Sequence, residues 1–252
     1  MRLTKIPKYK FLLVMKYESF DDALSDAEVL VESDPAAIET IDEKILSLAR
    51  TDEIYNKIKL FIADEKDSSG TKIRPTRTIN LVEFSGNNKK KLEQSISLLC
   101  KVAKQNKNES GKATGYYKTS DPNEIKNLWN LRKKGVGLLG KTEGERKPIP
   151  FVEDTAVPIQ NLARYISDFK KLLDSYDLEY AMYGHVDVGC LHVRPALNLK
   201  KPEEELWIRE LSDKVVRLVK KYDGVMWSEH GRGFRSEYTA DFFGEELHQD
   251  LQ

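Results

Sequence analysis

Residues 180–193 decide the fold of this chain: Tyr180-Ala181-Met182-Tyr183-Gly184-His185-Val186-Asp187-Val188-Gly189-Cys190-Leu191-His192-Val193. The stretch predicts extended chain and lies between two helical patterns. Before it, apolar residues recur at helical spacing, at Leu162, Ile166, Phe169 and Leu173. After it, residues 202–222 form a long amphipathic pattern with glutamates in the first turn and lysines in the last, as the helix dipole favours. The order predicts strands packed between helices.

The same alternation continues toward the N-terminus. Further strands are expected over residues 10–17, 78–84, 113–118 and 151–157. Helices are expected after the capping residue Ser19, from Asp34-Pro35, over residues 92–103 and from Asp121-Pro122. Residues 63–71, 104–111 and 140–147 are polar and predict surface loops. The order favours an α+β fold, an antiparallel sheet with helices packed on one face, ferredoxin-like and with duplication as an open alternative.

Composition excludes several classes of protein. The 252 residues suffice for one large domain or two small ones. Lysine plus arginine (41) equals aspartate plus glutamate (41), so no net charge favours nucleic acid or acidic membranes. Cys100 and Cys190 are too few for a disulfide framework, and the apolar run at residues 11–15 is too short for a membrane span. We therefore expect a soluble cytoplasmic protein without nucleic-acid partners.

Three of the four histidines fall in two short polar segments, residues 184–192 and 228–233. Imidazoles from His185 and His192, with the carboxylate of Glu229, are the groups of a divalent-metal site. The two histidines are seven residues apart, so a regular strand would place them on opposite faces. Glycines at 184 and 189 allow the turn or bulge that a shared ion requires. Histidines that hydrogen-bond to loop backbone are the open alternative.

Two nitrogens and one oxygen with an open position suit catalytic zinc, and the same set also suits iron or manganese. Side chains of adjacent residues usually diverge, which argues against His230 and Glu229 binding the same ion. His230 is therefore expected to act as a general base, because its ordinary pKa lies near operating pH.

The two segments resemble the C-terminal substrate domain of FAD-linked oxidases of the vanillyl-alcohol-oxidase type, a family that includes D-lactate and D-2-hydroxyglutarate dehydrogenases. The resemblance rests on Gly-His-x-x-x-Gly-x-Leu-His at 184–192 and Glu-His-Gly-x-Gly at 229–233. Trp129-Asn130-Leu131-Arg132 and the stretches 151–158 and 233–238 extend it. The likeness is strong over residues 129–244 and weaker over residues 1–128.

The resemblance implies roles for single residues. It implies His185, His192 and Glu229 as metal ligands and His230 as the base that takes the proton of the substrate's α-hydroxyl while hydride leaves for the flavin. Arginines are the natural anchors for a substrate carboxylate, and the candidates are Arg132, Arg194 and Arg235. For Arg235 a surface ion pair with Glu237 is the alternative. Lys147 is a weaker candidate and is more simply a solvated loop lysine. Cys190 stands where many members have an asparagine near the substrate. Asp187 either orients His185 or is only a turn residue, and both remain open.

The resemblance also implies partners. Members bind FAD mainly through a separate N-terminal domain, and this chain has neither a Gly-x-Gly-x-x-Gly turn nor a cysteine set for an iron–sulfur cluster. We expect residues 1–252 to be a single substrate domain of a larger bacterial FAD and iron–sulfur oxidoreductase, with Met1 added or fortuitous, and peripheral membrane association of that parent is open. The alternatives are a stand-alone metallohydrolase and a non-catalytic ferredoxin-like ligand-binding module.

Overall fold

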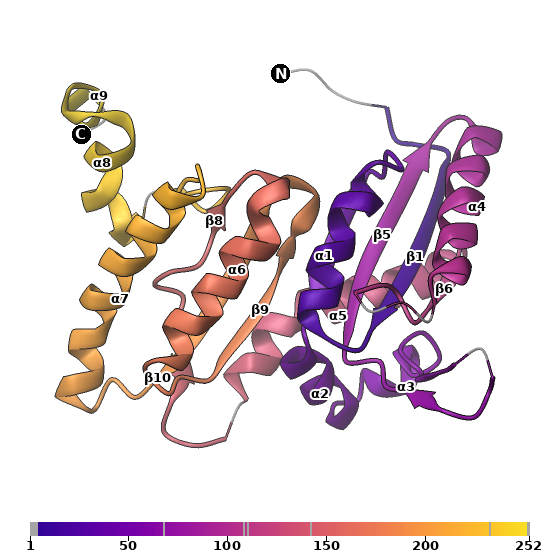
Figure 1. Ribbon diagram of the computed structural model, residues 1–252, viewed down its shortest axis with the longest axis horizontal. Helices are drawn as coiled ribbons and strands as arrows, with labels where there is room; N and C mark the ends of the chain where they lie inside the picture. The colour runs from indigo at the N-terminus through magenta and orange to yellow at the C-terminus, as the bar shows by residue number, and fades with distance from the viewer. Residues whose placement is uncertain are drawn as a thin grey trace. The chain divides into compact units, whose positions relative to one another are not determined.

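The computed structural model describes residues 5–67, 69–107, 109, 111–141, 143–231 and 233–250, and for Phe234 the backbone alone. Met1 and Arg232, the latter within the segment 228–233, lie outside these residues. The chain divides into two compact units. Unit 1 comprises residues 1–141 and 185–187, and unit 2 comprises residues 142–184 and 188–252 (Figure 1).

Unit 1 is built on an antiparallel sheet whose strands lie in the order β6-β1-β5-β2. Its strands are β1 (Tyr9–Tyr17), β2 (Ala37–Ile41), β5 (Thr78–Gly86) and β6 (Gly115–Thr119), and a small hairpin pairs β3 (Glu65–Lys66) with β4 (Ile73–Arg74). Its helices are α1 (Phe20–Val31), α2 (Glu43–Thr51), α3 (Tyr55–Ile58), α4 (Lys89–Gln105) and α5 (Pro122–Gly140).

Two helices of unit 1 begin where their capping residues predict. The Ser19 hydroxyl accepts a hydrogen bond from the Asp22 backbone N–H at 3.1 Å, at the start of α1. The Asp121 carboxylate accepts from the first turn of α5, and Pro122 follows it. Both caps satisfy backbone donors that the helix itself leaves unpaired. These two helix starts are confirmed.

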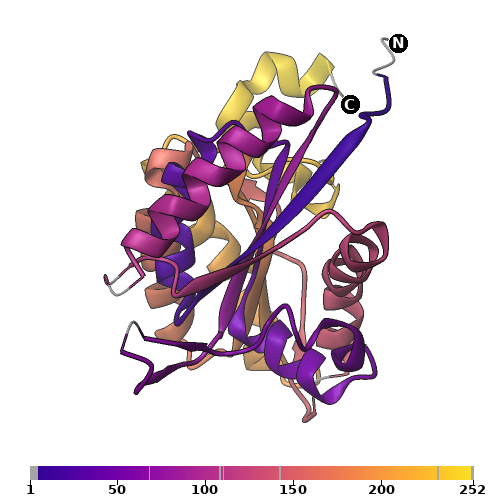
Figure 2. The same ribbon diagram turned by 90° about the vertical axis from the view of Figure 1, so that its right-hand side faces the viewer.

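Two residues of β5, three positions apart, contact helices on opposite faces of the sheet in unit 1. Asn80 donates to the Ala23 carbonyl of α1 at 3.0 Å. Glu83 accepts a hydrogen bond from the Trp129 indole of α5 at 3.1 Å. Because side chains alternate along a strand, an even and an odd position face opposite sides. Figure 2 shows α4 and α5 on the two sides of the strands, so α5 adds a second covered face to the α+β arrangement that the sequence predicts.

The prediction of a helix that begins at Asp34-Pro35 is wrong. Asp34 has a φ of 58°, and the following residues form β2, which pairs with β5. Ile38 and Ile41 are fully buried there. Pairing with a distant strand therefore outweighs the local proline signal. The strand expected over residues 151–157 is also mostly wrong.

Residues 151–157 form only the short strand β8 (Thr155–Ala156), because Asp154 at φ 67° interrupts the extended chain. Unit 2 further contains β7 (Lys147–Pro148), β9 (Tyr180–His185), β10 (Cys190–Leu197), α6 (Ile159–Asp174), α7 (Pro202–Lys221), α8 (Thr239–Phe243) and α9 (Glu245–Asp250). Short 3₁₀ turns span Val186–Val188 and Gly233–Tyr238. β10 pairs antiparallel with β7, β8 and β9.

The main strands and helices of the two units follow a similar order, although unit 1 has α2, α3 and the β3–β4 hairpin inserted between β2 and β5. In unit 1, β1 pairs with β5 and β6, and β5 pairs with β2. In unit 2, β10 pairs with both β8 and β9. Ala156 of β8 also forms an isolated antiparallel bridge with Val225. A ferredoxin-like unit has the order βαββαβ. The duplication and the single-domain assignment of residues 1–252 stay predictions. None of the helices among the described residues is long and apolar enough to cross a membrane.

Candidate metal and catalytic site

The chain turns between His185 and His192, as the glycines predict. β9 ends at His185, the 3₁₀ turn Val186–Val188 follows, and His192 lies on β10 opposite Tyr183. Gly189 has a φ of +69°, and a side chain there would overlap the Val157 carbonyl oxygen. The turn therefore requires glycine. Within unit 2, strand β10 places the His192 side chain in a buried position.

Unit 2 gathers two imidazoles and two carboxylates. His192 Nε2 lies 3.2 Å from Glu229 Oε1, and His230 Nε2 lies 3.4 Å from the same oxygen. The two rings stack with centroids 4.9 Å apart and an interplanar angle of 7°. With Asp154, each residue offers a ligand atom within 4.8 Å of the others. These are the donor types that zinc prefers in proteins.

The expectation that Glu229 and His230 diverge is wrong. Their side chains bring Oε1 and Nε2 to 3.4 Å. The cause lies in the backbone, because residues 228–230 form no regular strand or helix in which successive side chains would alternate. Both residues can therefore approach one point, and the assignment of His230 as base rather than ligand stays a prediction.

Asp154 holds this loop. Its fully buried carboxylate accepts hydrogen bonds from the backbone N–H groups of Ser228, Glu229 and His230, each at 3.0–3.1 Å. The Arg235 guanidinium lies 3.6 Å from Asp154 Oδ2 and also donates to the Glu153 carbonyl. Burial lowers the pKa of Arg235, and the two neighbouring carboxylates oppose that shift. The Asp154 carboxylate is therefore already occupied by backbone donors and by Arg235.

We predict that Asp154→Asn loosens the loop. The amide nitrogen cannot accept a hydrogen bond, so buried N–H groups lose their partner at a cost of about 1–3 kcal/mol. Urea unfolding should show this loss, and calorimetric titration should show zinc affinity lowered by about tenfold or more. Asp168→Asn is the matched control, because Asp168 lies on the surface of α6 with Lys221 and Tyr222. It should change stability by less than about 1 kcal/mol and leave zinc affinity unchanged; equal effects of the two variants would contradict the prediction.

Two predicted substrate residues of unit 2 already have protein partners. Arg194 Nε donates to Glu153 Oε2 at 2.8 Å, and the guanidinium lies 5.8 Å from the Tyr183 ring. Tyr183 also packs on His192, with centroids 5.1 Å apart, so Arg194 and His192 share a face of β10. Cys190 is fully buried, 3.9 Å from Asp154 Oδ1. The substrate roles of both residues stay predictions.

Arg235 is buried rather than at the surface. The alternative of a surface ion pair with Glu237 is not what the structure shows, because Glu237 pairs with Arg209. Its role toward substrate also stays a prediction.

Unit 1 contains a second polar cluster around Glu39. His185 Nδ1 lies 2.5 Å from Glu39 Oε1, and Arg132 Nε lies 2.7 Å from Glu39 Oε2. Burial raises the pKa of Glu39, but the hydrogen bond from His185 and the charge of Arg132 outweigh it and hold that pKa below its ordinary value. A carboxylate on Nδ1 is the usual partner of a histidine that binds metal through Nε2. Burial raises the pKa of Asp187 in the adjoining turn, and both readings of Asp187 stay open.

The positions of Glu39, Glu153 and Asp154 in these clusters were not predicted from the sequence. A signal was available for all of them, because each carboxylate stands in a short stretch made otherwise of apolar residues and threonine, at residues 37–41 or 151–157. Charged residues are almost never buried unless they are paired. Such positions therefore indicate side chains with fixed partners.

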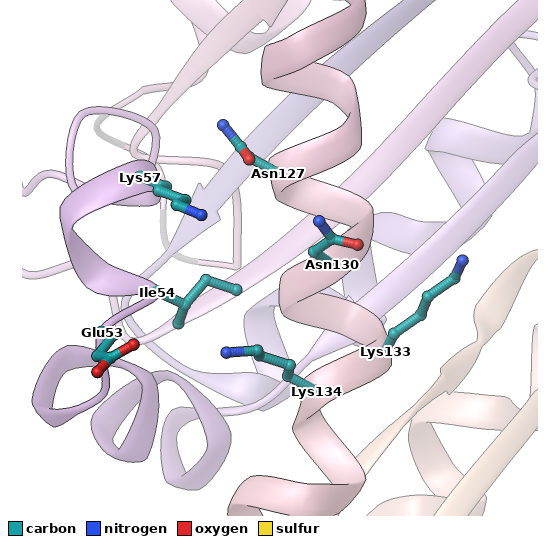
Figure 3. A pocket seen from close by; sticks show the side chains of 7 residues that line it. All are labelled: Glu53, Ile54, Lys57, Asn127, Asn130, Lys133 and Lys134. Atoms are coloured by element: carbon teal, nitrogen blue, oxygen red, sulfur yellow. The ribbon is translucent and has the colours of Figure 1, made fainter.

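A separate cavity in unit 1 carries none of the predicted site residues. It measures about 300 Å³ and lies between α3 and α5 (Figure 3). Lysines and asparagines dominate its lining, which consists of Glu53, Ile54, Lys57, Asn127, Asn130, Lys133 and Lys134. Figure 3 shows Lys133 pointing away from Ile54. This cavity offers amines and amides but no imidazole, unlike the cluster in unit 2.

Comparison with known proteins agrees with the motifs. The sequence model of the family "FAD linked oxidases, C-terminal domain" matches residues 6–251. The chain belongs to this family. It is 44% identical to the D-2-hydroxyglutarate dehydrogenase of Haemophilus influenzae and 41% identical to that of Escherichia coli, over 100% and 99% of this chain. Identity to D-lactate dehydrogenase [cytochrome] 1 of Saccharomyces cerevisiae is 24% over 95% of the chain.

Coverage of these relatives is partial. The chain spans 24% of the length of the two bacterial dehydrogenases and 38% of the yeast protein. Among solved structures, p-cresol methylhydroxylase gives a TM-score of 0.62 at 12% identity, over 97% of this chain and 50% of that one. The 4-ethylphenol oxidase of Gulosibacter chungangensis gives 0.59 at 12% identity, over 100% and 52%. These structures confirm the α+β fold class.

Proposed function

We propose that this chain is the metal- and substrate-binding domain of an FAD-dependent dehydrogenase that oxidises a D-2-hydroxy acid to the 2-oxo acid. The observation that carries the proposal is the cluster of His192, Glu229 and His230 in a chain of the FAD-linked oxidase family. D-2-Hydroxyglutarate is the favoured substrate, because relatives at 41–44% identity bear that name. Lactate and glycolate are the alternatives.

The donor set fits a small divalent cation, zinc first and iron or manganese as alternatives. We propose His192 and Glu229 as ligands, with His185 added from the sequence resemblance. When bound, the cation would acidify the substrate's α-hydroxyl and the flavin would accept hydride. His230 would take the hydroxyl proton at Nε2. The side chains of Arg132, Arg194, Cys190 and Arg235 are the proposed substrate contacts.

The proposal extends to a partner domain. FAD would be held mainly by an FAD-binding domain elsewhere in the same parent protein, which we place in the cytoplasm. This agrees with relatives of which the chain spans only a quarter.

We predict the properties of the isolated 252-residue chain. It should purify colourless and fail to oxidise D-2-hydroxyglutarate, since the main surface for FAD is elsewhere, yet it should bind zinc in calorimetric titration. His192→Ala should abolish zinc binding because it removes a buried ligand, and His248→Ala, which lies on α9 outside the cluster, should retain it. A yellow protein with stoichiometric flavin would contradict the proposal that FAD is held mainly by another domain. Turnover of esters or amides by this chain would instead favour a metallohydrolase.

A further inference from the structure

Glu153 lies between two functional candidates of unit 2. Its Oε2 accepts a hydrogen bond from Arg194 Nε at 2.8 Å, and its Oε1 lies 3.3 Å from His230 Nδ1. The next residue, Asp154, accepts the backbone N–H of His230 at 3.1 Å. Consecutive carboxylates thus fix both the ring and the backbone of His230.

The two nitrogens of the His230 ring face carboxylates of different character. Glu153, beside Nδ1, has a side chain only 9% exposed and held by Arg194. Glu229, beside Nε2 at 3.4 Å, has a side chain 46% exposed. A buried, immobilised carboxylate attracts a ring proton more strongly than an exposed one, because water screens the exposed charge. The neutral ring should therefore carry its proton on Nδ1.

We propose that Glu153 is a positioning residue that holds His230 in the Nδ1–H tautomer and directs the lone pair of Nε2 toward Glu229 and His192. Nε2 is then the basic nitrogen, as either a general base or a metal ligand requires. The tautomer is a property of this chain alone, whereas its use in proton transfer rests on the proposed function. The simpler reading, that Glu153 only neutralises Arg194, predicts no tautomer dependence.

The test uses the chain labelled with ¹⁵N-histidine and long-range nitrogen–proton correlation spectra at about pH 9, above the ordinary histidine pKa. With four histidines, the His230 signals are assigned by their loss in His230→Gln. We expect the Nδ1–H pattern in the parent chain. Glu153→Ala should move His230 toward the Nε2–H pattern, and Glu229→Ala, the matched control on the other nitrogen, should leave Nδ1–H in place.

An unchanged tautomer in Glu153→Ala, or a shift caused by Glu229→Ala instead, would overturn the proposal. If Glu153→Ala does not fold, Glu153→Gln replaces it; the amide oxygen still accepts, so a smaller shift in the same direction is expected, and no shift overturns the proposal.

Kinetics separate positioning from the proposed function. In the full-length protein, Glu153→Ala should lower kcat by about ten- to a hundredfold, with KM within about twofold and metal content retained. A tautomer shift without loss of kcat would support the positioning role of Glu153 and count against His230 as the base.

Discussion

His230→Ala should lower kcat of the full-length protein by about a hundredfold or more, the usual contribution of a positioned base. Metal content should stay near that of the parent protein, because His192 and Glu229 remain. Steady-state oxidation of D-2-hydroxyglutarate and elemental analysis of the purified variant measure the two quantities.

The comparison with His192→Ala makes this result decisive. His192 is buried and 3.2 Å from Glu229, so its removal should deplete the metal and weaken substrate binding together. The structure places His230 Nε2 almost as close to Glu229, at 3.4 Å. Metal loss in His230→Ala as large as in His192→Ala would therefore show that His230 is a ligand and not the base.

The fold could be predicted where local signals determine it. Capping residues Ser19 and Asp121 start α1 and α5 because their side chains bond to backbone within three residues. The region after Asp34 could not be predicted in this way. Its structure depends on pairing of β2 with β5, whose partners lie about forty residues further along the chain. Strand pairing of this kind leaves only a weak local signal.

For the candidate site, too, local features could be predicted and long-range contacts could not. Clustering of His192 and His230 with Glu229 in polar, glycine-containing segments was readable from the sequence. The approach of His230 to Glu229 was not, because the loop is shaped by Asp154, 76 residues before His230. The fixed roles of Glu153 and Arg194 likewise come from a contact across 41 residues. Chemistry could thus be predicted from residue types, and geometry required the long-range contacts.

Gly189→Ala should destabilise unit 2 by about 2–5 kcal/mol, combining about 1–2 for a left-handed backbone with a side chain and about 1–3 for overpacking. Gly189 has a φ of +69°, and an added Cβ would overlap the Val157 carbonyl oxygen. That oxygen cannot easily withdraw, because the Val157 backbone N–H donates to the Gly189 carbonyl at 3.0 Å. Urea unfolding of the 252-residue chain measures the loss.

Gly231→Ala is the matched control for this variant. Gly231 has nearly the same φ, +67°, but an added Cβ meets nothing within 4 Å among the described residues. It should therefore cost only the backbone contribution of about 1–2 kcal/mol. The excess loss in Gly189→Ala isolates the close approach of the turn to Val157. Equal losses in the two variants would show that the chain at Val157 yields, and that glycine at 189 is required only for its backbone conformation.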